Sequence, residues 1–184
     1  MRNIEQELKL FLDEREYRIL SEQAGALPQL QTNFYFGCQT MGKETMVRIR
    51  QKAGSYLLCY KHRMSQTEGV TVCDERESDV TPEDAKRMLT SGIRSDELRQ
   101  LLGVELDDVY CLGSMDTYRA KFQLQEWTIE LDKNVYLGRV DYELECENND
   151  MGSLNKLKNY LYYKFGVVIK PASPKVQRFY DART

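Results

Sequence analysis

The chain has 184 residues, of which 41% are hydrophobic and 30% charged, with only 4 Pro and 11 Gly. This composition predicts one globular domain over residues 1–184 and excludes a disordered, collagen-like or disulfide-stapled protein. Lys and Arg total 26 and Asp and Glu 29, so the net charge of −3 does not favour a nucleic-acid partner. The sequence has no apolar run of membrane-spanning length and no apolar signal region near residue 1. We therefore expect a cytoplasmic protein with no membrane partner.

The first half of the chain predicts mostly strands. Apolar and charged side chains alternate with period 2 over residues 2–12, which indicates a strand. Residues 13–26 predict a helix, with Asp13 as its N-cap and Glu16 as the capping-box partner. Four more strands, separated by turns that contain glycine, are expected at about 28–37, 43–52, 55–63 and 70–78.

The second half continues this pattern. Thr81 is expected to cap one helix, and a second helical segment covers about 95–102. Three strands are expected at about 107–124, 126–133 and 135–147, with residues 132–134 turning the second into the third, and a helix follows over 151–165. Since about eight antiparallel strands suffice to close a barrel, the sequence predicts a strand-rich α+β fold. Its architecture would be a closed eight-stranded antiparallel barrel, or tunnel, with the helices packed outside.

One face of the expected strands is apolar, and the other carries ionisable residues, often as like charges two positions apart. These residues are Glu5, Glu7, Lys9, Arg48, Arg50, Lys61, Glu75, Glu77, Arg119, Lys121, Glu130, Asp132, Asp141, Glu143, Glu145 and Glu147. Like charges at this spacing lie roughly 7 Å apart and repel each other unless a counter-ion lies between them. If these faces line a barrel interior, the cations match a phosphate chain and the carboxylates match Mg²⁺ or Mn²⁺. The alternative is a solvated sheet face with weak salt bridges.

In the order and spacing of these charged residues, the chain resembles the CYTH superfamily, also called triphosphate tunnel metalloenzymes, over about residues 3–178. The resemblance implies an eight-stranded antiparallel tunnel that needs a divalent metal, Mg²⁺ or Mn²⁺. It implies a hydrolase that transfers a phosphoryl group from a triphosphate to water. The expected substrate is a small molecule, with inorganic tripolyphosphate favoured over thiamine triphosphate or a nucleoside triphosphate.

The resemblance also implies roles for individual residues. Those implied to bind metal are Glu5, Glu7, Asp132, Glu143 and Glu145. Those implied to bind the substrate phosphates are Lys9, Arg48, Arg50, Lys61, Arg119, Lys175 and Arg178. Lys9, Arg50 and Asp132 are expected to act in catalysis, with Asp132 orienting the attacking water or helping to hold a second metal. Lys175 and Arg178 are expected to close one end of the tunnel.

Three other functions remain open at this point. A class IV-type adenylyl cyclase would hold the triphosphate in the same way but release cAMP and pyrophosphate. A non-catalytic module would bind polyphosphate or nucleotides without turnover, and a structural barrel with a salt-bridged lumen would bind neither. The sequence is compatible with a monomer or a homodimer.

Overall fold

The computed structural model describes residues 2–25, 27–67, 70–148 and 150–183, apart from the side chains of residues 2–6, 66–67 and 70–71. Within them lie eight strands: β1 Arg2–Leu12, β2 Gln29–Gly37, β3 Thr45–Lys52, β4 Ser55–Thr67, β5 Val70–Val80, β6 Tyr110–Leu124, β7 Trp127–Tyr136 and β8 Arg139–Glu147. The helices are α1 Glu14–Ala24, α2 Pro82–Ser91, α3 Ser95–Leu102, α4 Met151–Phe165 and α5 Lys175–Arg183. No helix in these described ranges combines the length and the apolar character needed to cross a membrane.

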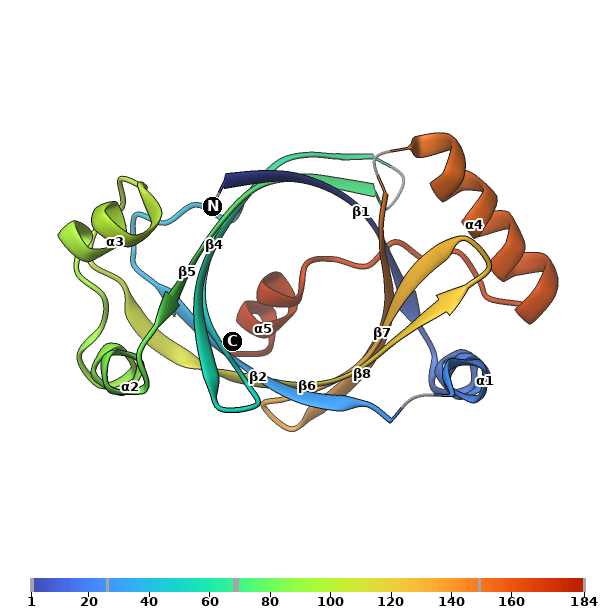
Figure 1. Ribbon diagram of the computed structural model, residues 1–184, viewed down its shortest axis with the longest axis horizontal. Coiled ribbons are helices and arrows are strands. Elements are labelled where there is room, and N and C mark those ends of the chain that lie inside the picture. The colour runs from blue at the N-terminus through green and yellow to red at the C-terminus, as the bar shows by residue number, and fades with distance from the viewer. Residues whose placement is uncertain (1, 26, 68–69, 149, 184) are drawn as a thin grey trace.

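The strands form one antiparallel sheet in the order β1-β5-β4-β3-β2-β6-β7-β8. Strand β1 pairs with both β5 and β8, so the sheet closes on itself as a barrel. Figure 1 looks through this ring, with α1, α2, α3 and α4 around its outside. The predicted strand-rich α+β class with eight antiparallel strands is confirmed.

Alternation along the strands sends apolar side chains outward against the helices. One cluster joins Leu8, Leu10 and Leu144 of the sheet to Leu20 of α1 and Leu157 of α4, all of them fully buried. A second, separate cluster covers the outer face of β2, β3 and β4 with residues of α2 and α3. Burial of each such leucine contributes about 1.5–3 kcal/mol relative to exposure. The outer face therefore supplies the hydrophobic core and leaves the inner face for polar side chains.

The expectation that the helices pack outside the barrel is wrong for α5, which lies within the outline of the ring (Figure 1). Its Val176 and Phe179 pack against Tyr35, Met115 and Tyr136 from the inner faces of β2, β6 and β7. The rings of Tyr35 and Phe179 lie 5.1 Å apart, centroid to centroid. The inner wall at this level is apolar, and α5 supplies the apolar side chains that cover it.

The turn expected at residues 132–134 is also wrong. Strand β7 continues to Tyr136, and the chain reverses at Leu137 and Gly138, whose φ angles are +46° and +74°. Positive φ at both central positions is the geometry of a type I′ hairpin, which matches the twist of the flanking strands. As a result Asp132 and Asn134 lie inside the barrel, each 0% exposed.

The predicted start of the first helix is confirmed. The Asp13 carboxylate accepts a hydrogen bond from the Glu16 backbone N–H, and the Glu16 carboxylate accepts one from the Asp13 backbone N–H, both at 2.8 Å. Thr81 likewise caps α2 by accepting from the Asp84 backbone N–H at 3.1 Å. These caps satisfy amide groups that would otherwise lack a partner within the helix.

Candidate active site

The interior of the barrel holds a cavity of about 290 Å³ whose walls are strongly charged. Alternate residues of the strands reach it, because every second side chain points to the same face of a sheet. The lining includes twelve charged side chains that the sequence had placed on the inner face, namely Glu7, Lys9, Arg48, Arg50, Lys61, Glu75, Glu77, Arg119, Lys121, Glu130, Glu145 and Glu147. The parity predicted from the sequence is thus found in the structure.

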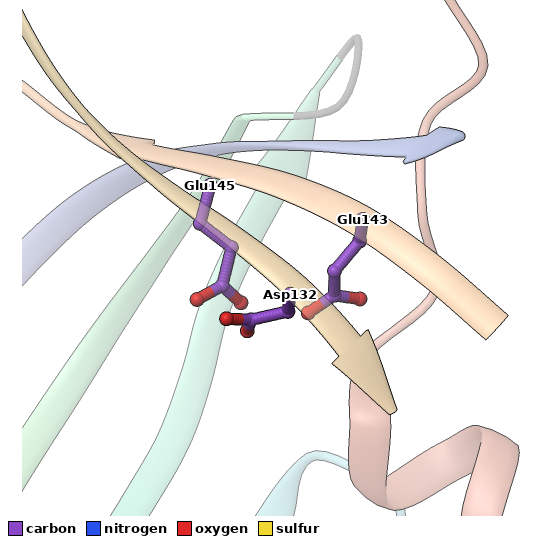
Figure 2. Close-up of side chains that lie close together, drawn as sticks. All are labelled: Asp132, Glu143 and Glu145. Carbon is purple, nitrogen blue, oxygen red and sulfur yellow. The ribbon is translucent and has the colours of Figure 1, made fainter. Parts of the chain in front are cut away.

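Three carboxylates gather beside this cavity. Asp132 of β7 lies opposite Glu143 of β8 in the sheet register, and Glu145 follows two positions along β8. One oxygen from each lies within 4.8 Å of the other two, and Figure 2 shows the three groups pointing toward one another. Asp132 and Glu143 are 0% exposed, whereas Glu145 reaches the cavity wall. A compact set of carboxylate oxygens suits a hard divalent cation such as Mg²⁺ or Mn²⁺.

Basic side chains from the strands neutralise this cluster. The Arg119 guanidinium donates to both oxygens of Asp132, at 2.8 and 2.6 Å, and to Glu145 at 2.6 Å. Lys9 Nζ lies 2.6 Å from Glu145 and 3.4 Å from Glu7. Burial by itself would raise the pKa of Glu145, but the charges of Lys9 and Arg119 outweigh it and hold that pKa well below its usual value.

Two cations from α5 complete the neutralisation. Lys175 Nζ lies 2.9 Å from Asp132 and 3.0 Å from Glu145, and it also contacts Glu143. Arg178 contacts Glu143 and lies 2.5 Å from Asp141. Burial would raise the pKa of Asp132, yet Lys175 and Arg119 lower it below the ordinary value. The two tail residues thus meet the carboxylates, whereas the sequence had predicted that they bind phosphate.

Glu7 is buried apart from that cluster. Its carboxylate lies 3.2 Å from Lys61 and 3.4 Å from Lys9, and Lys61 also lies 3.3 Å from Glu75. Lys9 therefore forms ion pairs with both Glu7 of β1 and Glu145 of β8. The backbone of Glu5 lies in β1, but its predicted metal-binding side chain is outside the described residues.

The wall formed by β3 differs, because its two arginines lack acidic partners. Arg48 and Arg50 both line the cavity. Neither forms an ion pair with a carboxylate in the described part of the chain, and the Nε atoms of both are buried without a hydrogen-bond acceptor there. Two guanidinium groups on one wall, neither of them in an ion pair with a carboxylate of the described residues, have the chemistry to bind an anionic ligand.

Asn33 belongs to the same wall, and sequence reasoning missed it. It lies directly opposite Arg50 in the β2–β3 register and lines the cavity. It is 1% exposed, and neither its Nδ2 nor its Oδ1 has a hydrogen-bond partner among the residues described. A buried amide without partners is costly unless water or a ligand satisfies it. Its signal in the sequence was weak: one amide in phase with Gln31 and Tyr35 on an otherwise unremarkable strand.

A closed antiparallel barrel with acidic and basic inner walls defines the class of this protein. The family model described as the CYTH domain matches residues 3–180, so the chain belongs to the CYTH family. The resemblance seen in the charged strand residues is confirmed.

The individual relatives described below share less than 30% sequence identity with this chain. The chain is 28% identical over 156 residues to "Putative triphosphatase YjbK" of Bacillus subtilis (strain 168), covering 83% of this chain and 80% of the relative. Among solved structures, a Hippeastrum protein described as "Putative adenylyl cyclase HpAC1" with a dominant triphosphatase activity superposes with a TM-score of 0.78. It is 23% identical, over 96% of this chain and 95% of the other. A Bacillus halodurans protein described as a putative adenylate cyclase has a TM-score of 0.77 at 24% identity, over 97% and 98% of the two chains. These two structures share the fold.

Proposed function

We propose that this protein is a metal-dependent triphosphatase that hydrolyses inorganic tripolyphosphate, or a related small-molecule triphosphate, inside the barrel. The observation that carries the proposal is the separation of charge in one cavity. On one wall lie the guanidinium groups of Arg48 and Arg50, which form no ion pair with a carboxylate of the described residues, and on another lies Glu145, a member of the three-carboxylate cluster. An anion and a divalent cation that binds to it would satisfy both walls together. The name of the Bacillus subtilis relative supports the same activity.

The carboxylates fit the metal that this activity needs. Asp132, Glu143 and Glu145 would hold Mg²⁺ or Mn²⁺, with Glu5 and Glu7 as further ligands, because both ions prefer oxygen donors. A bound divalent ion would neutralise charge on the phosphate oxygens during phosphoryl transfer.

The basic side chains would hold the triphosphate. An arginine can donate two parallel hydrogen bonds to phosphate oxygens, so Arg48 and Arg50 would be the main residues that bind the triphosphate. Lys9, Lys61 and Arg119 would add charge along the chain of phosphates. Fixed positive groups aimed at developing negative charge stabilise the transition state electrostatically. Lys9 and Arg50 would act in this way, and Asp132 would orient the attacking water.

The test measures product release from tripolyphosphate, ATP and thiamine triphosphate in parallel, each with Mg²⁺, with Mn²⁺ and with EDTA. We expect metal-dependent orthophosphate release that is lost in the Arg48→Gln, Arg50→Gln double variant. Arg99→Gln is the matched control, because Arg99 is exposed and pairs with Glu105 at 2.7 Å away from the barrel interior. Pyrophosphate release from ATP would reassign the protein as a cyclase. Triphosphate binding without turnover would make it a binding module.

A further inference from the structure

Lys175 occupies a central position among the candidate metal ligands. Its ammonium lies at hydrogen-bond distance from Asp132 and Glu145 and contacts Glu143, so one cation touches all three carboxylates. It is the first residue of α5, whereas the carboxylates belong to β7 and β8. Among the described residues, the strand cations contact fewer of these groups: Arg119 contacts Asp132 and Glu145, and Lys9 contacts Glu145.

Lys175 also faces the cavity beside these carboxylates. Lys175 and Glu145 line the cavity, but Asp132 and Glu143 do not and are 0% exposed. Lys175 is thus a cavity-lining cation that contacts both of these buried groups. Mg²⁺ binds its ligand oxygens at about 2.0–2.1 Å, closer than a hydrogen bond. The Lys175 ammonium lies among the oxygens that such an ion would bind. The ion and the ammonium therefore cannot occupy this position at the same time.

We propose that Lys175 is a built-in counter-ion that fills the position of the divalent cation in the metal-free protein and is displaced when the metal binds. This inference rests on the metal-binding part of the proposed function. Lysine suits the role because its charge is carried on a flexible four-carbon stem. The displaced ammonium has space, since Lys175 already faces the 290 Å³ cavity.

The remainder of α5 acts as a tether for this lysine. Phe179 is 0% exposed in the apolar cluster with Tyr35 and Met115, and Arg178 is bonded to Asp141. These contacts do not involve Lys175, so the helix stays docked while the lysine side chain leaves. The ammonium therefore remains close and returns when the metal dissociates. A ligand that binds only one of two states has its apparent affinity reduced by the fraction of that state.

The first test is Mn²⁺ affinity without substrate, measured by titration calorimetry. If the lysine-free state is populated at about 1–10%, Lys175→Met should bind Mn²⁺ about 10- to 100-fold more tightly than the wild type. Lys170→Met is the matched control, because Lys170 lies in the same tail and its Nζ is 3.8 Å from Glu16 on the outside. Its affinity should stay within about twofold of the wild type. An equal affinity for Lys175→Met and the wild type overturns the proposal.

The second test needs no variant and separates displacement from simple charge repulsion. Wild-type protein is acetylated with acetic anhydride, with and without saturating Mn²⁺, and the lysines are quantified by mass spectrometry. We expect Mn²⁺ to increase labelling of Lys175 several-fold and to leave Lys170 unchanged. If saturating Mn²⁺ leaves the labelling of Lys175 unchanged, the inference is overturned, even if Lys175→Met binds Mn²⁺ more tightly than the wild type. Absence of Mn²⁺ binding in both wild type and Lys175→Met would instead refute the proposed metal site, and this inference with it.

Discussion

Arg50→Gln should separate function from stability. Arg50 and Arg48 occupy alternate positions of β3 and line the cavity, with no carboxylate partner in the described chain. Side chains at this spacing lie about 7 Å apart, and two unit charges at that distance repel by about 2 kcal/mol at an effective dielectric constant of about 20. Replacing Arg50 by a neutral residue of similar length removes this repulsion and breaks no ion pair. The free energy of unfolding should therefore stay constant or rise by up to about 2 kcal/mol.

Activity should move in the opposite direction. Loss of one fixed charge-stabilising group costs roughly 10²–10³-fold in kcat, so orthophosphate release should fall by that factor. Arg119→Gln is the informative comparison, because Arg119 holds Asp132 and Glu145 inside the barrel. Removing one partner of a buried pair costs about 3–5 kcal/mol, and since Lys175 still contacts Asp132 we expect about 3. Urea unfolding and phosphate release measure the two effects. The reasoning fails if Arg50→Gln keeps its activity or loses as much stability as Arg119→Gln.

Three further outcomes are expected. Asn33→Ala should reduce phosphate release while leaving the free energy of unfolding within about 1 kcal/mol, because its amide has no partner among the described residues; a larger loss in urea unfolding would contradict this. Folding lowers the pKa values of Asp132 and Glu145, so without metal the free energy of unfolding should fall as the pH drops below about 4.5. In Glu145→Gln the free energy of unfolding should change less steeply with pH. An equally steep change would refute the assignment of this pH dependence to Glu145. Phe179→Ala should cost about 3–5 kcal/mol in thermal unfolding if α5 docks as described, and less than 1 kcal/mol would show that it does not.

The side chains of the inner wall could be predicted because alternate residues of a β-strand point to opposite faces of the sheet. A slip of one residue would turn every charged side chain of a strand into the apolar layer beneath the helices, so only one register is tolerable. Lys9, Arg48, Lys61 and Arg119 therefore revealed their side of the sheet from sequence alone. The capping box at Asp13 was predictable for a similar reason, since its partners lie within one helical turn.

Contacts between distant segments could not be read in this way. The tail around Lys175 has two prolines and a short apolar pattern, and nothing local shows that Val176 and Phe179 fit inside a barrel. The pairing of Lys175 with Glu145 spans 30 positions and depends on that docking. The turn was misplaced because Asp132-Lys133-Asn134 is a polar run, which locally resembles a turn. Burial in the barrel and ion pairs to other strands override that local preference.

The pairing of β1 with both β5 and β8 has a consequence for how the chain folds during synthesis. Its first partner, β5, ends at Val80, but its second partner, β8, spans Arg139–Glu147. One side of β1 therefore stays unpaired until residues 139–147 have left the ribosome. An unpaired strand edge invites association with other chains, and pairings so distant in sequence slow folding. Pairing of β1 is thus complete only after β8 has emerged, and premature termination before β8 would leave an aggregation-prone sheet.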